Sequence, residues 1–546
     1  MPRDLSFEIT ANVVDVLNRR IFPGRVEVAD GKIVAIRETG ERPSTFVLPG
    51  LIDAHVHVES SMLVPSEFAR AAVVHGTVAS VSDPHEIGNV LGTAGVEYML
   101  ENAAAVPFKF NFGAPSCVPA TVFETAGAAI DVTQVARLLD DPRIGYLSEM
   151  MNYPGVLAGD KDVLAKIAAA QLLDKPVDGH APGLRGEAAA AYIAAGITTD
   201  HECFTKDEAL DKLRCGAKIL IREGSAARNF DALCTLIDEY PEMCMLCSDD
   251  KHPDELLAGH INVLVRRAIE RGIDRFNVLR AACVNPVLHY GMNVGLLRPG
   301  DDADFIEVGS LERMDVLRTF IRGRLVAADG QTTIPRIEPR VVNRFHGRVR
   351  TPDEFRVRAE GERLNVIEAI DGQLITRRLV ERATVHDGLA IADAARDILK
   401  IAVVNRYVSA APAVAFVRSF GLKRGAIASS VAHDSHNVIA VGVDDDDLCA
   451  AINFVIEAGG GLSVAGDGVR KVLPLPVAGL MSTETCAAVG AAYALLDQQV
   501  KSFGSQLRAP FMTLSFMALL VIPDLKLSDK GLFDGKTFQF LPLFAD

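Results

Sequence analysis

The chain has 546 residues, which is too long for one ordinary domain and predicts about two to four of them. Hydrophobic residues make up 49% of it and charged residues 23%, a composition that supports a large buried core and excludes intrinsic disorder. The formal net charge of -15 disfavours nucleic acid and anionic membranes as main partners, because phosphate binding relies on Lys and Arg.

Targeting signals and cysteine pairs are not apparent. No apolar run reaches the roughly 18–20 residues that a membrane-spanning helix needs. The first residues, MPRDLSFEIT, lack the apolar core of a signal peptide, so we expect a cytoplasmic location. The nine cysteines are scattered, as is typical of free thiols in a reducing compartment. Cys244 and Cys247 have metal-like spacing, but strand residues three apart point to opposite faces, so we expect no metal there.

Two β-rich segments flank a long middle segment. Over residues 7–48 the sequence alternates apolar and polar residues around a Gly-Arg and an Asp-Gly turn, which predicts short strands. A related pattern returns at 303–328. We therefore expect residues 1–48 and 291–345 to form one composite β domain.

The middle segment, residues 49–290, alternates short apolar runs with helical stretches. The predicted strands are LPGLIDAHVH, TVASVSDPH, FNFGAPS, GYLSEM, KPVDGH, GITTDH, AKILIREGS and MCMLCSDD. The predicted helices include 66–76, 91–104, 161–174, 186–195, 226–239 and 254–271. Eight β-then-α units in roughly 240 residues predict a (β/α)8 TIM-like barrel. A doubly wound open sheet is the alternative, weakened because no GxGxxG follows the first strand.

Residues 346–546 change pattern again and predict a separate C-terminal α/β domain. DEFRVRAEGERLNVIEAIDGQLIT is expected to form paired strands, and 425–468 is expected to form strand, strand, helix, glycine turn and strand. The acidic run 444–447 is predicted to cap that helix, and the glycines 459–461 to end it. We do not expect a phosphate-binding loop there, because no helix and lysine follow.

Polar side chains collect where the barrel strands end, which is where barrel enzymes place their chemistry. In chain order these residues are His55 and His57, Asp83 and His85, Ser116, Glu149, His180, His201, Glu223 and Asp249. One strand-end histidine is most often structural. Five of the thirteen histidines at equivalent points of a repeating unit, with Glu149 and Asp249, are hard to explain as packing.

The physical interpretation of this set is a metal site. His55 and His57 lie two apart on a strand, so both rings face the same side, and His180 and His201 approach from the opposite wall. Glu149 can bridge two cations, and Asp249 can ligate one of them and hydrogen-bond the bound water. Mixed imidazole and carboxylate ligation suits Zn, Fe(II), Mn or Co. Two such metals would lower the pKa of a bridging water to about 7, so the site is predicted to be hydrolytic.

These residues resemble the amidohydrolase superfamily. GLIDAHVH is similar to its first-strand metal motif, and Glu149 stands where many relatives carry a carboxylated lysine. A closer resemblance, from about residue 7 to residue 540, is to the microbial adenine deaminases. It is carried by HVHVESSM, SDPHEIGNVLG, APSCVPA, EMMNYPGV, DGHAPGL, IREGSAARN, CSDDKHP, HDSHN, GLMSTET and KGLFDG. Arg185 departs from the pattern, where a small residue is expected.

The resemblance implies hydrolysis of adenine to hypoxanthine and ammonia in purine salvage. It also implies a binuclear centre of Mn(II) or Fe(II), with Zn possible, and a homo-oligomer, most simply a dimer. The H-x-E…P-C-x-x-C signature of the other zinc deaminase class is absent from the sequence.

The expected mechanism is attack of the bridging hydroxide on C6 of adenine. Asp249 would accept the hydroxide proton and pass it to the leaving amine. Glu86 and Glu223 are the candidates for protonating the purine ring, although Glu223 could instead form a structural ion pair, for instance with Arg222. Asp250 is expected to hydrogen-bond a ring nitrogen.

Several roles stay open at this point. Ser116 could line the pocket or cap local backbone. Asp83 and His85 could bind substrate or an additional metal, or Asp83 could bond the turn itself. Taken alone, His433, Asp434 and His436 predict a turn, whereas the family resemblance implies that they reach the active site from their own chain or from a partner subunit. Glu59 is left as a loop residue near the site.

Two other functions compete with this one. Another amidohydrolase activity, such as cleavage of a cyclic amide or a different aminopurine, would use the same hydroxide. A non-catalytic scaffold should have lost ligands, but all six expected metal positions are filled: His55, His57, Glu149, His180, His201 and Asp249.

Overall fold

The computed structural model describes residues 6–225 and 227–545. Its middle segment contains parallel strands in chain order, forming a five-stranded and a three-stranded sheet. The first sheet consists of β5 (Leu51–Val56), β6 (Thr77–Ser82), β7 (Lys109–Ala114), β8 (Ile144–Met150) and β9 (Val177–Gly179). The second consists of β10 (Thr199–Asp200), β11 (Lys218–Arg222) and β12 (Cys244–Cys247). Each of these strands coincides with a segment predicted as a strand, with β7 and β8 beginning one residue before the predicted segment, so the eight strand predictions are confirmed.

The two sheets meet at both edges, so the strands curl around a common interior. Beside β9, the amide of Thr198 donates to the carbonyl of Val177 at 2.8 Å. At the other edge the amide of Asp249, just after β12, donates to the carbonyl of His55 at 2.9 Å. Strand β5 is buried along its whole length, as is typical of parallel strands covered on both faces.

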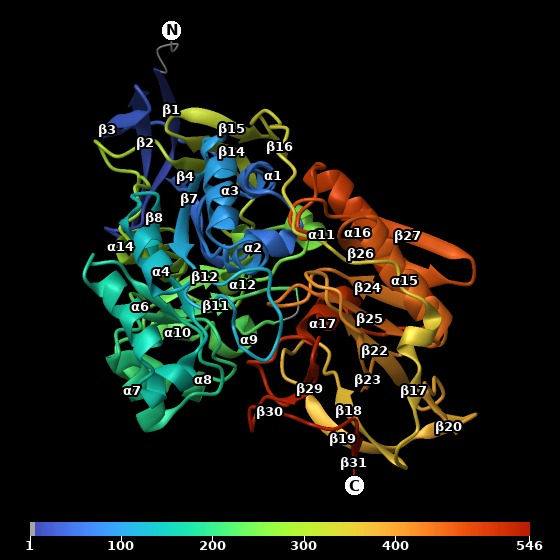
Figure 1. Ribbon diagram of the computed structural model, residues 1–546. Helices are drawn as coiled ribbons and strands as arrows, with labels where there is room; N and C mark the ends of the chain where they lie inside the picture. Colours follow the sequence, from blue (N-terminus) through green and yellow to red (C-terminus); the bar gives the residue numbers. More distant parts are fainter. Residues whose placement is uncertain (1–5, 226, 546) are drawn as a thin grey trace.

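Helices follow the strands and cover the outside of this curled sheet (Figure 1). They begin at capping residues: Asp131 forms a capping box with Gln134 at the start of α4, and Asp160 accepts two backbone amides at the start of α6. The helices are α1 (Pro65–Ala72), α2 (His85–Leu91), α3 (Thr93–Ala104), α4 (Val132–Asp140), α5 (Tyr153–Ala158), α6 (Lys161–Gln171), α7 (Gly186–Ala194), α8 (Lys206–Arg214), α9 (Phe230–Leu233), α10 (Leu236–Glu239), α11 (Pro253–Ala258), α12 (Ile261–Glu270), α13 (Arg275–Leu279) and α14 (Asn285–Tyr290).

Strands from both flanks of the middle segment share one sheet, in the order β16-β15-β14-β13-β4-β1-β2-β3. The N-terminal members are β1 (Phe7–Asp15), β2 (Arg20–Ala29), β3 (Lys32–Glu38) and β4 (Phe46–Pro49). The returning members are β13 (Phe305–Val308), β14 (Val316–Ile321), β15 (Arg324–Ala328) and β16 (Gln331–Thr332). Strand β4 lies between β1 and β13 and so joins the two flanks.

The C-terminal part is a mixed sheet with helices on it. Its strands are β18 (Arg363–Glu368), β19 (Arg377–Arg382), β22 (Ile398–Val404), β23 (Ala413–Arg418), β24 (Ala426–Ser429), β25 (Val438–Gly442), β26 (Gly461–Gly466), β27 (Val469–Pro474) and β31 (Phe544–Ala545). Its helices are α15 (Asp445–Glu457), α16 (Cys486–Ser502) and α17 (Pro510–Phe516). Smaller sheets join β17 (Val357–Arg358), β21 (Leu389–Ile391) and β20 (Thr384–His386), and β28 (Leu525–Ser528), β29 (Gly531–Asp534) and β30 (Gln539–Phe540).

Two details of this part test the sequence predictions. Asp444 caps α15, with its side chain accepting the amide of Asp447. The helix ends at Glu457, and β26 begins at Gly461. The predictions that the acidic run 444–447 caps this helix and that the glycines 459–461 end it are therefore confirmed. The prediction that residues 353–376 form paired strands is wrong. Strand β17 pairs with β21, whereas β18 pairs with β19 and β23. The two strands of this segment therefore belong to different sheets and do not pair with each other.

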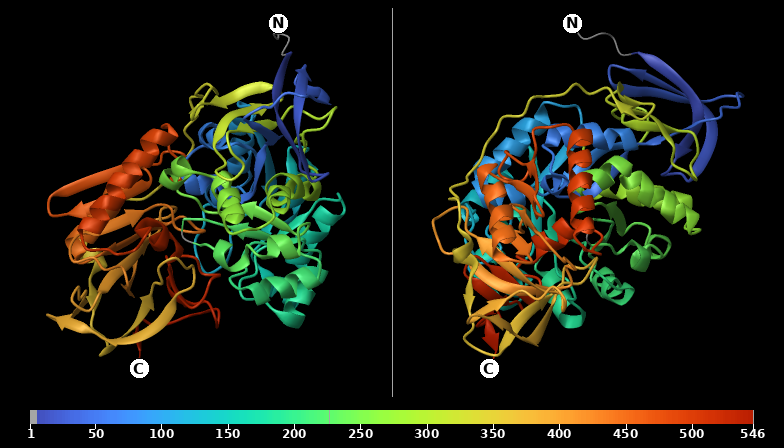
Figure 2. Two further views of the ribbon diagram at one scale, coloured as in Figure 1. Left: turned by 180° about the vertical axis from the view of Figure 1, so that it is seen from behind. Right: turned by 90° about the vertical axis from the view of Figure 1, so that its right-hand side faces the viewer.

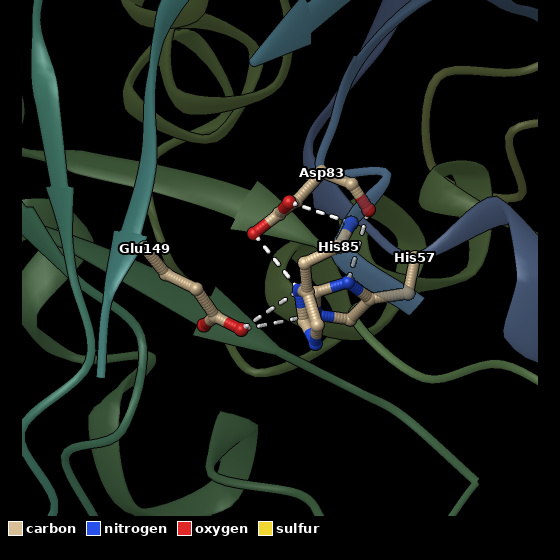
Figure 3. Close-up of side chains that lie close together, drawn as sticks. All are labelled: His57, Asp83, His85 and Glu149. Atoms are coloured by element: carbon tan, nitrogen blue, oxygen red, sulfur yellow. Dashed lines mark hydrogen bonds and ion pairs between the residues drawn. The ribbon is translucent and has the colours of Figure 1, made fainter. Parts of the chain in front are cut away.

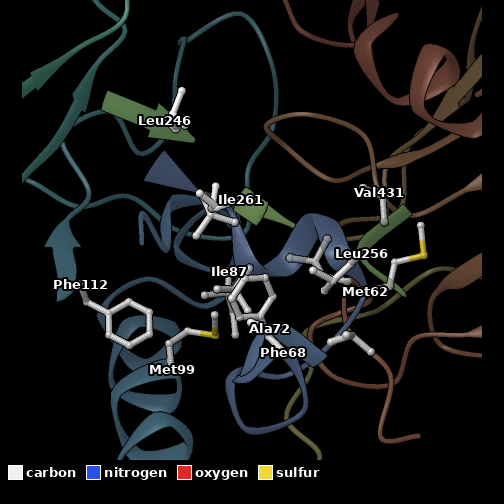
Figure 4. Close-up of a cluster of buried hydrophobic side chains, with 14 of the residues drawn as sticks. Met62, Phe68, Ala72, Ile87, Met99, Phe112, Leu246, Leu256, Ile261 and Val431 are labelled. Atoms are coloured by element: carbon white, nitrogen blue, oxygen red, sulfur yellow. The ribbon is translucent and has the colours of Figure 1, made fainter. Parts of the chain in front are cut away.

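The C-terminal part packs directly against the middle segment. Figure 2 shows the two side by side in its left view and the C-terminal part in front of the middle segment in its right view. Residues 335–350, which carry no helix or strand, lead from β16 to the C-terminal part. One apolar cluster runs across the contact: Val431 lies near Met62 and Leu256 in Figure 4. This burial, worth about 25 cal/mol per Å² of apolar surface, holds the two parts together.

All nine cysteines are free thiols, as expected. Cys244 and Cys247 belong to different apolar clusters, in agreement with the prediction that they face opposite ways. Within the described part of the chain, no helix combines the length and the apolar character that crossing a membrane requires.

Candidate active site

The strand-end histidines converge on Glu149, the penultimate residue of β8. Its Oε2 lies 2.9 Å from His201 Nε2, 3.0 Å from His180 Nδ1 and 3.8 Å from His55 Nε2. Its Oε1 lies 3.6 Å from His57 Nε2. The two oxygens of one carboxylate therefore face different histidines, as a bridging ligand does. We name His55, His57, Glu149, His180, His201 and Asp249 the floor of the site.

Asp249 completes the floor from the end of β12. Its Oδ1 lies 3.4 Å from His57 Nε2 and 3.9 Å from His55 Nε2, while its Oδ2 accepts a hydrogen bond from Arg222. Burial raises the pKa of Asp249, but the Arg222 guanidinium and the hydrogen bond to His57 outweigh it and hold the pKa well below its usual range. Asp249 is thus an ionised acceptor that faces the histidines.

Two charged residues of this site were missed by the sequence analysis. Glu202 is buried, lies 3.5 Å from both His180 Nδ1 and His201 Nε2, and accepts a bidentate pair from Arg222 at 2.6 and 2.9 Å. Glu202 directly follows His201, and Arg222 is the last residue of β11, so strand-end position was the signal that could have found them.

The floor has the chemistry and the spare atoms of a metal site. In three of its groups the ligand atoms lie within 4.8 Å of one another: His55, His57 and Asp249; His55, Glu149 and His201; His180, His201 and Glu202. Nδ1 of His55 and Nε2 of His180 are buried without a hydrogen-bond partner among the described residues. Imidazole nitrogens and carboxylate oxygens are what transition-metal cations prefer, so the residues fit such ions.

Asp83 and His85 lie next to His57 and Glu149 of the floor (Figure 3). Asp83 Oδ1 accepts the amide of His85 at 3.1 Å, and its Oδ2 lies 3.1 Å from His85 Nδ1. The backbone carbonyl of Asp83 faces His57 Nδ1 at 3.3 Å, which leaves His57 Nε2 directed at the floor. His85 lines the pocket and Asp83 does not. Ligand atoms of His57, Asp83, His85 and Glu149 lie within 4.8 Å of one another, so an additional metal at Asp83 and His85 stays a prediction.

Glu223, predicted as a candidate acid, points away from the site, and this prediction is corrected. Its Oε1 pairs with Arg267 at 2.6 Å and with Arg228 at 3.4 Å. Successive residues at a strand end face opposite sides, so Arg222 takes the inward position. The ion-pair alternative was correct, but the partner Arg222 was not.

Two further residues also lie outside the pocket. Ser116, predicted to bind substrate or cap backbone, donates to the carbonyl of Glu149 at 2.5 Å and does not line the pocket, so it supports the bridging residue from behind. Arg185, the departure from the family pattern, is about half exposed and pairs with Asp211 at 2.8 Å.

The segment after β5 supports the site. Ser60 Oγ donates to Asp250 Oδ1 at 2.5 Å and so fixes the carboxylate that lines the pocket next to Asp249. Glu59 is buried, and its Oε1 accepts the amide of Ile87 at 3.2 Å. It therefore anchors the first turn of α2, which carries His85 and Glu86.

The C-terminal part covers the floor from within the same chain. The residues of this part that line the pocket, which we name the roof, are Leu374, His433, Asp434, Phe516 and Leu519. His433 Nδ1 and His436 Nε2 each contact one oxygen of Glu86, so the cluster does reach the site. The free volume at the centre of the pocket is about 20 Å³, room for about one water.

Known proteins resemble this chain along its whole length. The amidohydrolase family model matches residues 46–326, and the adenine deaminase C-terminal domain model matches residues 373–539. The adenine deaminase of Salinibacter ruber is 59% identical, covering 99% of each chain, and that of Sulfurovum sp. is 54% identical, covering 98% of this chain and 99% of the other. A solved beta-aspartyl dipeptidase from Fervidobacterium islandicum AW-1 is 15% identical with a TM-score of 0.47, covering 61% of this chain and 99% of that one. The two family models and the full-length relatives place the chain in the adenine deaminase family of amidohydrolases.

Proposed function

We propose that this chain hydrolyses adenine to hypoxanthine and ammonia. Adenine deaminase is the name that its full-length relatives carry. The observation that carries the proposal is the geometry of Glu149, whose two oxygens face different histidines in a buried pocket that Asp249 and Asp250 also line.

We further propose that the six floor residues hold two divalent cations, Mn(II) or Fe(II), with Zn as an alternative. Bound cations would lower the pKa of a water they hold to about 7, which supplies a nucleophile at neutral pH. Glu149 would contact both ions, because its oxygens face opposite histidine groups. Through its bidentate pair, Arg222 would fix the two carboxylate oxygens of Glu202 beside the floor.

The reaction assigns distinct tasks to the two aspartates. Asp249 accepts a proton from the attacking water through Oδ1, the oxygen that faces the histidines, and delivers it to the leaving amine. Arg222 keeps Oδ2 occupied, so Oδ1 would serve both as the oxygen that faces the cations and as the one that accepts the proton. Asp250, held by Ser60, hydrogen-bonds a purine ring nitrogen.

The architecture that we propose for this activity is a (β/α)8 barrel of residues 49–290 between the two parts of a composite β domain, 1–48 and 291–345. Residues 346–546 form the C-terminal α/β domain that closes the pocket. A homodimer and a cytoplasmic location stay predictions, as does the absence of nucleic acid among its partners.

One steady-state assay tests the function. The purified chain is loaded with Mn(II) or Fe(II), and ammonia release is measured with adenine, adenosine and cytosine. A hydantoin is assayed in parallel by ring opening. We expect turnover of adenine that exceeds the others by at least 100-fold. Preferred hydrolysis of the hydantoin, or of a different aminopurine, would contradict the proposal in favour of another amidohydrolase activity.

A further inference from the structure

Glu86 and His433 form a buried pair that joins the middle segment to the C-terminal part. Glu86 lies in the first turn of α2 and is 2% exposed, and His433 is equally buried. His433 Nδ1 contacts Glu86 Oε1, and His436 Nε2 contacts the other oxygen, Oε2. Both carboxylate oxygens of Glu86 are therefore engaged by histidines rather than directed freely into the pocket.

The opposite nitrogen of His433 is the one available to a ligand. Nε2 is buried and has no hydrogen-bond partner among residues 6–225 and 227–545. His433 lines the pocket together with Asp250 and every floor residue except His55, whereas His436 does not. The ring of His433 stacks on Phe516 with centroids 4.5 Å apart and planes 12° from parallel, which fixes its orientation.

We propose that His433 is a catalytic residue of the adenine deamination proposed above, donating the Nε2 proton to the purine ring nitrogen next to C6, with Glu86 as its positioning residue. The inference rests on that proposed function and changes the role that the sequence predicted for Glu86. A carboxylate that holds the far nitrogen of an imidazole fixes its tautomer and stabilises its charged form.

The electrostatics of the pair agree with this geometry. Burial lowers the pKa of His433, but the carboxylates of Glu86 and Asp250 outweigh it and raise the pKa to about 9. Burial raises the pKa of Glu86, but His433 and His436 hold it well below its usual range. The shared proton thus resides on the histidine. The other titratable groups facing His433 are His252, Asp434 and His436.

The proton balance of the step closes. The water oxygen forms a bond to C6, and the electron pair of the C6–N bond moves onto the ring nitrogen, which takes the proton of His433. One water proton goes to Asp249 and leaves with the amine as ammonia. A lone pair of the added oxygen then forms the carbon–oxygen double bond of hypoxanthine as the bond from C6 to the exocyclic nitrogen breaks, and the electron pair of that bond leaves with the ammonia. The second water proton leaves the oxygen and restores His433.

The test compares His433→Gln with His436→Gln, a matched control that touches the same carboxylate without lining the pocket. Loss of an acid in the transition state predicts a fall in kcat of about 10²–10⁴-fold for His433→Gln, with KM within about threefold. His436→Gln should lose less than about tenfold. Both variants should keep the metal content of the wild type, which separates the effect from loss of the floor.

If His433→Gln does not fold, a second variant, Glu86→Gln, still tests the proposal. In Glu86→Gln the neutral amide no longer supports the charged imidazole, so the alkaline limb of kcat/KM should move down by more than one pH unit. An unmoved limb, or equal losses in the two histidine variants, would overturn the proposal. If the wild type does not deaminate adenine, the proposed function itself is wrong. If the wild type and His433→Gln are both active, only the role proposed for His433 is wrong.

Discussion

The floor and the roof of the pocket are built in different ways. Every floor residue lies at or next to the end of a parallel strand, where backbone hydrogen bonds between neighbouring strands fix its position. The roof residues come from loops and the end of α17, and they reach the pocket only because the C-terminal part packs against α1 and α11. The proposed metal binding therefore falls to side chains at strand ends, and the proposed proton supply to a side chain in a loop.

The largest effect should come from removing a floor histidine. His201→Ala deletes the imidazole 2.9 Å from Glu149, so the chain should bind fewer than two metals and release no measurable ammonia from adenine. His289→Ala is the matched control, because His289 is a histidine of the same fold that faces Thr198 rather than the pocket. Metal analysis of both variants checks this, and a fully loaded His201→Ala would contradict the floor as defined.

Asp249→Asn tests the floor without dismantling it. Asp249 has a φ of 53°, and asparagine tolerates this left-handed conformation, so the fold should be kept. Loss of the proton acceptor should lower kcat by about 10³-fold. The measurement is ammonia release from adenine at equal metal content. Turnover near that of the wild type would remove Asp249 from the mechanism.

The roof depends on an unusual lysine. Lys526 is fully buried and donates to the carbonyls of Leu374 and Phe516 at 2.7 and 2.8 Å. Burial lowers its pKa from 10.5 to about 7. As pH falls from 10.5 to about 7 the unfolded chain takes up a proton that the folded chain does not, so stability decreases, by about 1.4 kcal/mol per pH unit.

Lys526→Met should therefore be less stable than the wild type at pH 10, because two carbonyls lose their donor. The difference should shrink or reverse at pH 7. Denaturant unfolding at both pH values checks this, and Lys536→Met, at a lysine whose side chain is 64% exposed, should show no such change. A difference that is the same at both pH values would mean that Lys526 is protonated in the folded chain.

The smallest effect should come from Glu223. Glu223→Gln removes the charge of a buried carboxylate that pairs with Arg267 and Arg228, and it leaves the pocket untouched, so it should cost stability rather than activity. Ammonia release should stay within about twofold of the wild type. A loss of more than tenfold would restore Glu223 as a catalytic candidate.

The floor could be predicted from the sequence, whereas most of the roof could not. The parallel strands were predictable because each is a short apolar run with a polar residue at its end, and this repetition also located His55, His57, Glu149, His180, His201 and Asp249. The error at Arg222 and Glu223 came from choosing between adjacent residues that face opposite ways, which depends on exactly where β11 ends. A pattern of residue types does not fix that end to within one position.

The roof could not be found in this way. Leu374, Phe516 and Leu519 are apolar residues with no pattern that separates them from the core. They become part of a site only through contacts with residues hundreds of positions earlier. His433 was noticed as a motif, but its partner Glu86 lies 347 positions away, and only the packed chain brings the two together.

The chain order of floor and roof has a consequence for biosynthesis. The last roof residue, Leu519, follows the last floor residue, Asp249, by 270 positions. At about 5–20 residues per second, roughly 14–54 s pass between the synthesis of the last floor residue and that of the last roof residue. A nascent chain therefore carries the complete floor before the last roof residue has been made. If the floor holds cations as proposed, the ions present during translation are the first to meet it.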